Sequence, residues 1–163
     1  MSDTAEVVQL ESRADWRDWL ERNHETAVGV WLVTWKKPTG KPRVDYDAAV
    51  EEALCFGWID GWFKPIDDDR GVIRYTPRLK GSNWSKYNIA TAWNLLNENK
   101  MTPAGVAKLP KDVLVVWEKY RPRATVVVRV TQGRGIIFAD GKNYLSMIKM
   151  PARAPVKNDT SAN

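Results

Sequence analysis

Apolar positions near the start of the chain recur at the spacing of a helix. We expect this helix from about residue 13 to residue 22, with its core side chains at Trp16, Trp19 and Leu20. Ser12 and Asp15 stand three residues apart before this stripe, which is typical of a capping box that satisfies the free N–H groups of a first turn. The next apolar run, Val28 to Trp35, shows no polar alternation and predicts a strand buried on both faces.

A second helix and a hairpin follow in the pattern. Asp45 can cap a helix whose apolar stripe is Val50, Ala53 and Leu54, and Gly57 can supply the left-handed residue after its end. Residues 58–64 and 72–76 then read as two strands joined at the turn Asp67-Asp68-Asp69-Arg70-Gly71. Strand alternation places Trp58, Asp60 and Trp62 on one face, and pairing of like parity would add Arg74 and Thr76 to it.

The later segments are predicted mainly as helices. A third helix opens at Gly81-Ser82-Asn83, capped by Ser82 or Asn83, with a core stripe of Ile89, Trp93 and Leu96. Thr102-Pro103 begins a short fourth helix. Pro110 to Tyr120 suits a helix or, because of its valines, a strand. Residues 125–130 and 136–139 suggest a second hairpin, and the chain from Pro151 onward reads as a disordered end.

Charge divides the chain into two parts. Residues 1–118 hold 16 Lys/Arg and 18 Asp/Glu, whereas residues 119–157 hold nine basic residues and one acid, which is a net charge of +8. We therefore expect an α+β domain over residues 1–118 and a basic segment, a possible hairpin with a disordered end, over residues 119–163. A stretch of this charge can attract nucleic acid or an anionic surface, or it can be the solvated side of a half-buried strand.

The composition also bears on the compartment. Cys55 is the only cysteine, so it cannot form an internal disulfide, and it is expected to be a packed core residue. The first ten residues lack the basic and apolar regions of a secretory signal, and no apolar run has the roughly 18–20 residues that span a bilayer. We predict a cytoplasmic protein with no transmembrane segment. The composition does not indicate an oligomeric state.

Four ordered motifs carry a resemblance to a known family: residues 54–61 (LCFGWIDG), 74–78 (RYTPR), 81–88 (GSNWSKYN) and 101–105 (MTPAG). Together they resemble the bacterial YdeI/OmpD-associated proteins of the YjbR/CyaY-like superfamily, over about residues 13–107. The resemblance implies a small α+β fold with an antiparallel sheet and flanking helices. It also implies a link to bacteriocin or antimicrobial-peptide tolerance, and it supplies no established catalytic residue.

The candidate site lies in these same motifs. A hairpin followed by a helix start would gather tryptophan, arginine and small polar side chains around a cleft that suits a small anionic ligand. The ligand-binding candidates are Asp60, Arg74, Arg78, Ser82, Asn83, Trp84 and Asn88. We expect a non-enzymatic binding module here, with no cofactor.

Two other functions remain open. Asp60 is either an ordinary cross-strand ion-pair partner or a carboxylate in an aromatic-walled cleft, where it would serve a metal-free hydrolase or transferase as general acid or base. The basic residues 119–157 would instead make the chain a weak nucleic-acid-binding protein. We predict no metal site, because Asp67, Asp68 and Asp69 lack calcium-loop spacing and the single histidine, His24, has no ligand nearby in sequence.

Overall fold

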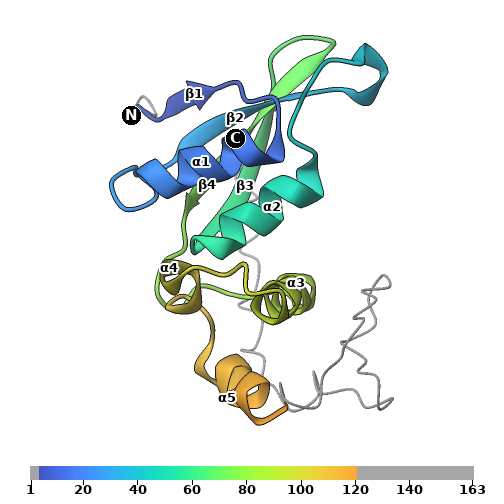
Figure 1. Ribbon diagram of the computed structural model, residues 1–163. Helices are drawn as coiled ribbons and strands as arrows, with labels where there is room; N and C mark the ends of the chain where they lie inside the picture. Colours follow the sequence, from blue (N-terminus) through green and yellow to red (C-terminus); the bar gives the residue numbers. More distant parts are fainter. Residues whose placement is uncertain (1–3, 121–163) are drawn as a thin grey trace, which may run out of the picture.

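The structure, a computed structural model, describes residues 4–120, in which strands and helices form an α+β fold (Figure 1). The predicted class, α+β with flanking helices, is confirmed, and the sheet is antiparallel except for one parallel pair at its edge. Within the described residues the elements are β1 (Glu6–Val8), α1 (Arg13–Asn23), β2 (Val30–Trp35), the 3-10 helix η1 (Lys37–Thr39), α2 (Tyr46–Cys55), β3 (Trp58–Pro65), β4 (Arg70–Pro77), α3 (Lys86–Asn97), α4 (Pro103–Val106) and α5 (Lys111–Tyr120).

The sheet has the strand order β1-β2-β4-β3. β1 runs parallel to β2, and the β2–β4 and β4–β3 pairs are antiparallel. The hydrophobic pattern did not predict β1, because three residues are too few to show a period. The strands predicted at residues 28–35, 58–64 and 72–76 are present with small shifts at their ends. Because β3 is last in the strand order, it is an edge strand of the described sheet.

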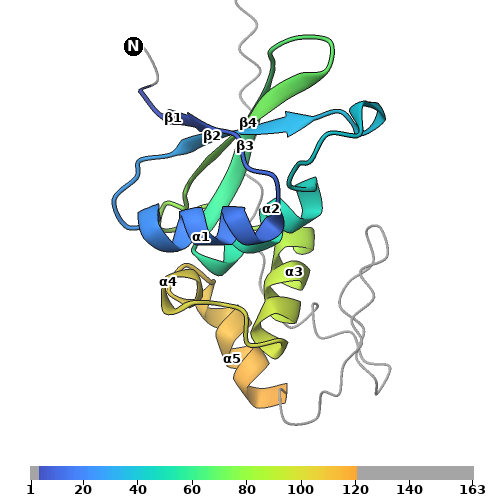
Figure 2. The same cartoon turned by 45° about the horizontal axis from the view of Figure 1, so that its top comes forward.

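Helices α1 and α2 cover one face of the sheet (Figures 1 and 2). Aromatic rings pack between these helices and the strands. Trp16 of α1 stacks on Trp19 with ring centroids 5.4 Å apart, and it lies 5.1 Å from Tyr75 of β4. Trp58 of β3 meets Trp19 edge-on at 5.8 Å. The Ser12 half of the predicted capping box is present, since the Asp15 N–H donates to the Ser12 hydroxyl; the Asp15 carboxylate accepts from that hydroxyl.

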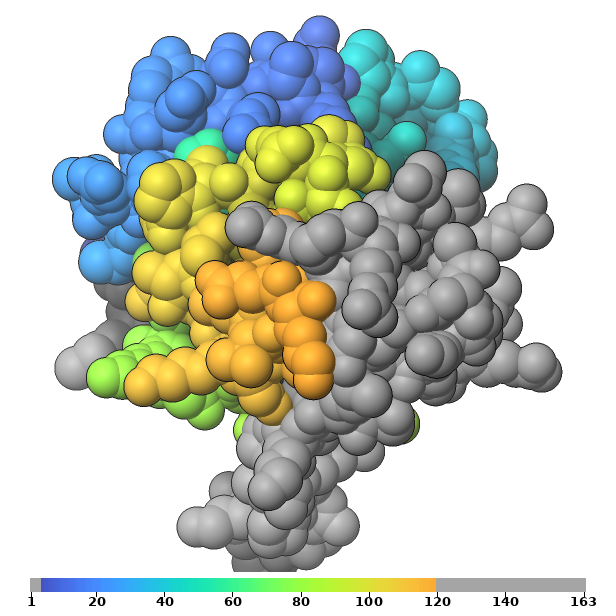
Figure 3. Space-filling model, turned by 60° about the horizontal axis from the view of Figure 1, so that its bottom comes forward, coloured from blue at the N-terminus to red at the C-terminus, as the bar shows by residue number. Residues whose placement is uncertain are grey.

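Helices α3, α4 and α5 form a second group at one end of the sheet (Figures 1 and 2). In the space-filling view from below, their surfaces adjoin each other beneath α1 (Figure 3). The predicted stripe of α3 is buried at Ile89, Trp93 and Leu96. Thr102 caps α4 as predicted, and its hydroxyl also donates to the Cys55 carbonyl at 2.6 Å, which ties α4 to the end of α2.

The predicted face of β3 is wrong because a bulge interrupts the strand. Asp60 pairs with Tyr75 and Phe63 pairs with Ile73, so Gly61 and Trp62 together stand opposite the single residue Arg74. The alternation predicted from the sequence is lost at this point. Trp58 is buried in the core, whereas the Trp62 side chain is 84 % exposed.

The predicted start of the third helix is also wrong. Helix α3 begins at Lys86 with Ser85 as its N-cap, three residues or more beyond Ser82 and Asn83. The Trp84 ring packs against the guanidinium of Arg78, and the Asn83 carbonyl accepts a hydrogen bond from it, so this segment is held as a loop. The Asp45 side chain likewise binds Arg43 rather than capping α2, although Asp45 is the N-cap residue.

The predicted elements after residue 110 lie partly outside the described residues. The segment from residue 110 to residue 120, for which helix and strand were both open, is the helix α5. The predicted hairpin at residues 125–130 and 136–139, and the end from residue 151, lie outside the described residues. No helix of residues 4–120 is long and apolar enough to cross a membrane.

Candidate functional site

Asp60 lies near the start of β3, on the same side of the sheet as the core helices. Its carboxylate accepts a hydrogen bond from the Tyr46 hydroxyl at 2.6 Å, and its cross-strand partner is Tyr75. The expectation that Asp60 shares a face with Arg74 and Thr76 is wrong, because the register before the bulge joins residues of opposite parity. Asp60 is half-buried.

Arg74 lies on the other face of the sheet and does not join Asp60. Its guanidinium carbon is 5.5 Å from the centroid of the Trp31 ring, its cross-strand neighbour on β2. The same guanidinium lies against Gly29, where the φ angle is 156° and a Cβ atom would stand 2.6 Å from Nη1. Arg74 thus stacks on the Trp31 ring on the second face of the sheet, and it is not part of the site predicted around Asp60.

Arg78 follows β4 directly and is the most unusual residue of the described chain. Its side chain is almost completely buried, with 1 % exposed. The backbone N–H of Arg78 donates to the Gly57 carbonyl at 2.9 Å, which closes the base of the hairpin. The guanidinium lies 3.8 Å from the centroid of the Trp84 ring, and Nη1 donates to the Asn83 carbonyl at 3.2 Å.

The other edge of that guanidinium has no partner in the described part of the chain. Nε and Nη2 are both buried and have no hydrogen-bond partner among residues 4–120. These two N–H groups point the same way and form the fork that takes two oxygens of a carboxylate or a phosphate. Burial lowers the pKa of Arg78 to about 10, and the nearby charge of Asp60 opposes this shift. No carboxylate of the described chain forms an ion pair with Arg78.

The loop after Arg78 carries three more predicted residues, of which Asn83 and Trp84 contact the guanidinium. The Ser82 hydroxyl is buried and has no partner in the described part of the chain. Asn83 contributes its carbonyl, and Trp84, with 6 % exposed, contributes its ring. Asn88 lies further on, in the first turn of α3, where its backbone N–H donates to the Ser85 hydroxyl at 3.0 Å.

Two tyrosines that sequence reasoning missed complete the polar surroundings. Tyr75 is fully buried, and its hydroxyl has no hydrogen-bond partner within residues 4–120. Burial, and then the charge of Asp60, raise the pKa of Tyr75. Burial and the hydrogen bond to Asp60 raise the pKa of Tyr46 as well, so both phenols stay protonated as hydrogen-bond donors. Their signal in the sequence was weak, since a tyrosine in a strand or at a helix start is ordinary.

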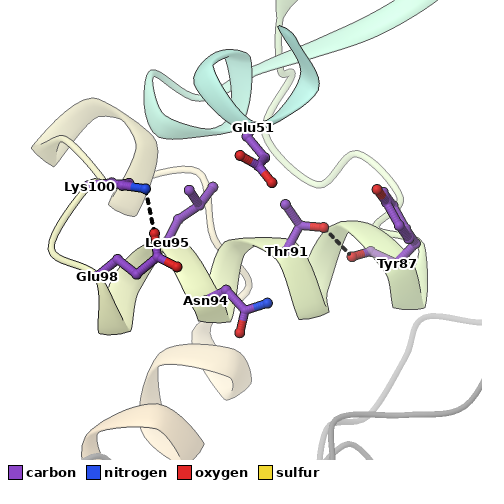
Figure 4. A pocket seen from close by; sticks show the side chains of 7 residues that line it. All are labelled: Glu51, Tyr87, Thr91, Asn94, Leu95, Glu98 and Lys100. Atoms are coloured by element: carbon purple, nitrogen blue, oxygen red, sulfur yellow. Dashed lines mark hydrogen bonds and ion pairs between the residues drawn. The ribbon is translucent and has the colours of Figure 1, made fainter. Parts of the chain in front are cut away.

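A cavity of about 330 Å³ lies elsewhere, between α2 and α3 (Figure 4). It is lined by Glu51, Tyr87, Thr91, Asn94, Leu95, Glu98 and Lys100. None of the seven predicted site residues lines it. Asp60 therefore does not lie in this cavity, so the enzymatic use of Asp60 gains no support from its geometry.

The residues considered for metal or thiol chemistry have structural roles. Asp67 accepts hydrogen bonds from the backbone of Asp69 and Arg70, and its carboxylate pairs with the Arg70 side chain at 2.8 Å, as in a tight turn. No group of three or more potential metal ligands occurs in the described residues. Cys55 is buried, as expected, and burial raises the pKa of its thiol to about 11.

The fold and this site define a small α+β domain with a buried arginine at the base of its hairpin. The chain belongs to a family described as a domain of unknown function (DUF8412), whose model matches residues 8–108. The match takes in strands β2 to β4 and helices α1 to α4; it begins at the last residue of β1 and ends before α5. No curated protein and no solved structure matches the chain. The family description names no activity, so the function rests on the chemistry of the site.

Proposed function

We propose that this protein is a non-enzymatic binding module for a small anionic ligand, with Arg78 as the anchor. The observation that carries the proposal is the Nε–Nη2 edge of a guanidinium that is 1 % exposed, an edge with no hydrogen-bond partner in residues 4–120. A buried charge without its partners is costly, and an oxyanion with two oxygens would supply both hydrogen bonds and the opposite charge. A carboxylate or phosphate group is the chemistry that fits this fork.

The neighbouring side chains support an oxyanion at this place. The Ser82 hydroxyl, four residues after Arg78 on the same loop, is also buried and without a partner in the described chain, so it is a further donor near the anchor in sequence. The Trp84 ring holds the guanidinium plane from one side, so the fork has a fixed direction. Because the Arg78 side chain is only 1 % exposed, a ligand reaches the fork only after the structure around it opens, and the loop from Leu79 to Ser85 is the segment known to contact the guanidinium.

The first half of this loop is exposed, and its second half is anchored in the core. The Leu79 side chain is 80 % exposed, and Gly81 holds a φ angle of 77°, where glycine meets no strain. Trp84, in contrast, is 6 % exposed and belongs to the hydrophobic core, and the Asn83 carbonyl accepts a hydrogen bond from Arg78. Opening the whole loop would expose the Trp84 ring, and the free energy of anion binding must offset that cost.

Thermal unfolding of the full chain against a panel of nucleotides, sugar phosphates and cell-wall fragments tests the proposal. We expect at least one anionic member to raise the midpoint by several degrees, as a ligand that binds only the folded state must. Arg78→Lys keeps the charge but removes the fork, so it should abolish most of the rise. Trp84→Ala should weaken it, and Arg22→Met, a change at an exposed arginine of α1, should leave it intact. A rise that survives both Arg78→Lys and Trp84→Ala contradicts the site.

The cellular role is proposed from the resemblance to the YdeI/OmpD-associated proteins alone. On that basis the protein acts in the cytoplasm and contributes indirectly to survival under bacteriocin or cationic-peptide stress. Deletion of the gene should then lower survival against several such peptides. A deletion strain with unchanged susceptibility would remove this role and would leave the anion site untouched.

A further inference from the structure

The cavity between α2 and α3 has a lining that the anion site does not explain. Glu51 reaches it from α2, and one face of α3 supplies the residues at positions 87, 91, 94 and 95 (Figure 4). Glu98, the C-cap of α3, and Lys100, in the segment after the helix, complete the lining. A volume of about 330 Å³ is at the small end of the range of ligand pockets, about 300–1,000 Å³.

The hydrogen-bonding groups of this lining are mostly acceptors. Glu51 binds Arg13 through Oε2 at 2.7 Å, which leaves Oε1 without a partner in the described residues. The Thr91 hydroxyl gives its hydrogen to the Tyr87 carbonyl at 3.0 Å, so its lone pairs remain for a ligand. The cation of Lys100 is already engaged, because Nζ lies 2.6 Å from the Glu98 carboxylate.

The electrostatic environment on the Tyr87 side is negative. The Tyr87 hydroxyl lies 3.5 Å from a carboxylate oxygen of Asp47, and the charge of Glu51 also acts on it. Burial, and then these two carboxylates, raise the pKa of Tyr87. The Tyr87 side chain is 47 % exposed, so its ring can offer a face to a cation.

We propose that this cavity binds a small organic cation with a primary ammonium group. The ammonium donates to the free oxygen of Glu51 and to the Thr91 hydroxyl, beside the Tyr87 ring. The aliphatic part of the ligand lies along Leu95, the one apolar residue of the lining. Asn94 provides an amide oxygen for a second donor. This site is independent of the anion site at Arg78 and shares no residue with it.

Isothermal titration of the full chain with 1,4-diaminobutane tests the proposal, with 1,4-butanediol as the neutral probe of equal length. We expect saturable binding of the diamine and none of the diol. Glu51→Gln removes the charge while Glu52 still holds Arg13, so affinity should fall at least tenfold. Glu21→Gln, at an exposed position of α1, should leave affinity unchanged.

A second variant keeps the proposal falsifiable if Glu51→Gln fails to fold. Asn94→Asp adds a carboxylate to the lining, so it should tighten diamine binding several-fold. The absence of saturable binding, equal binding of the diol, or an affinity indifferent to both Glu51→Gln and Asn94→Asp overturns the proposal. None of these results depends on the Arg78 fork, so the two proposed sites are tested independently.

Discussion

Two buried charges in this molecule are held in opposite ways. Glu52 of α2, with 3 % exposed, accepts from the Arg13 Nε at 2.5 Å and from the Arg17 Nη1 at 2.7 Å, so each carboxylate oxygen has a cation. Arg78, with 1 % exposed, has an aromatic ring and one backbone carbonyl. The first arrangement joins α1 to α2. The second leaves Nε and Nη2 without a partner in residues 4–120, and this is why we propose it as a binding site.

The largest effect is expected at Glu52. Glu52→Gln keeps the shape but leaves two arginines facing a neutral amide, and breaking a buried pair in this way costs about 3–5 kcal/mol. Because Arg13 and Arg17 are each more than a third exposed and can be rehydrated, we expect about 3 kcal/mol. Urea unfolding measures the change, with Glu21→Gln as the exposed control. A loss below that of the control would show that the network contributes nothing to stability.

At Arg78 we expect a substitution to raise the free energy of unfolding rather than lower it. Arg78→Met removes a buried, incompletely bonded cation and keeps the volume beside Trp84, so the ligand-free protein should gain about 1–2 kcal/mol. The same variant should lose any stabilisation by anions. Urea unfolding in a buffer free of phosphate and carboxylates measures the first effect. A clear loss of stability would mean that Arg78 is fully satisfied in the folded protein.

The pH dependence follows from the lowered pKa of Arg78, about 10 in the folded protein against 12.5 ordinarily. Between these values the unfolded chain holds a proton that the folded chain has lost, so the stability contributed by this group rises with pH. The advantage of Arg78→Met over the parent protein should therefore shrink as pH increases through 10. Paired unfolding curves between pH 8 and pH 11 test this, and a constant difference would exclude it.

The smallest effect is expected at Cys55, which is buried and uncharged. Burial, and then the charge of Glu52, raise the pKa of its thiol to about 11, so little thiolate forms at neutral pH. The native protein should not react with a thiol reagent at pH 8, and it should react fully in urea. Rapid native labelling would show that the end of α2 opens readily.

The helices with a repeated apolar stripe could be predicted from the sequence, and the local geometry of the site could not. The stripes of α1 and α3 and the cap at Thr102 needed only residue type and spacing. Asp60 and Arg74 lie on opposite faces of the sheet because of the strand register beside the bulge at Gly61 and Trp62, and no residue type in the sequence predicts that bulge. The late start of α3 at Lys86 depends on the contact of Arg78 with Trp84, a tertiary interaction that overrides the capping tendency of Ser82 and Asn83.

The residues that line the cavity between α2 and α3 could not be predicted from the sequence either. Tyr87, Thr91 and Asn94 look like the ordinary solvent side of a helix in sequence, and only the approach of Glu51 from α2 turns that side into a lining. The resemblance to the YdeI/OmpD-associated proteins, the basic segment at residues 119–157 and nucleic-acid binding through it remain predictions.

The bulge in β3 also bears on how the chain behaves at high concentration. β3 forms an edge of the described sheet and displays Trp62 and Phe63, the kind of strand on which fibrils grow by repeated addition of identical chains. The bulge breaks the regular backbone ladder at Gly61 and Trp62, Lys64 adds charge repulsion between copies, and Pro65 has no N–H to donate. The exposed aromatic pair is thus available for contact while the strand that carries it resists stacking into cross-β assemblies.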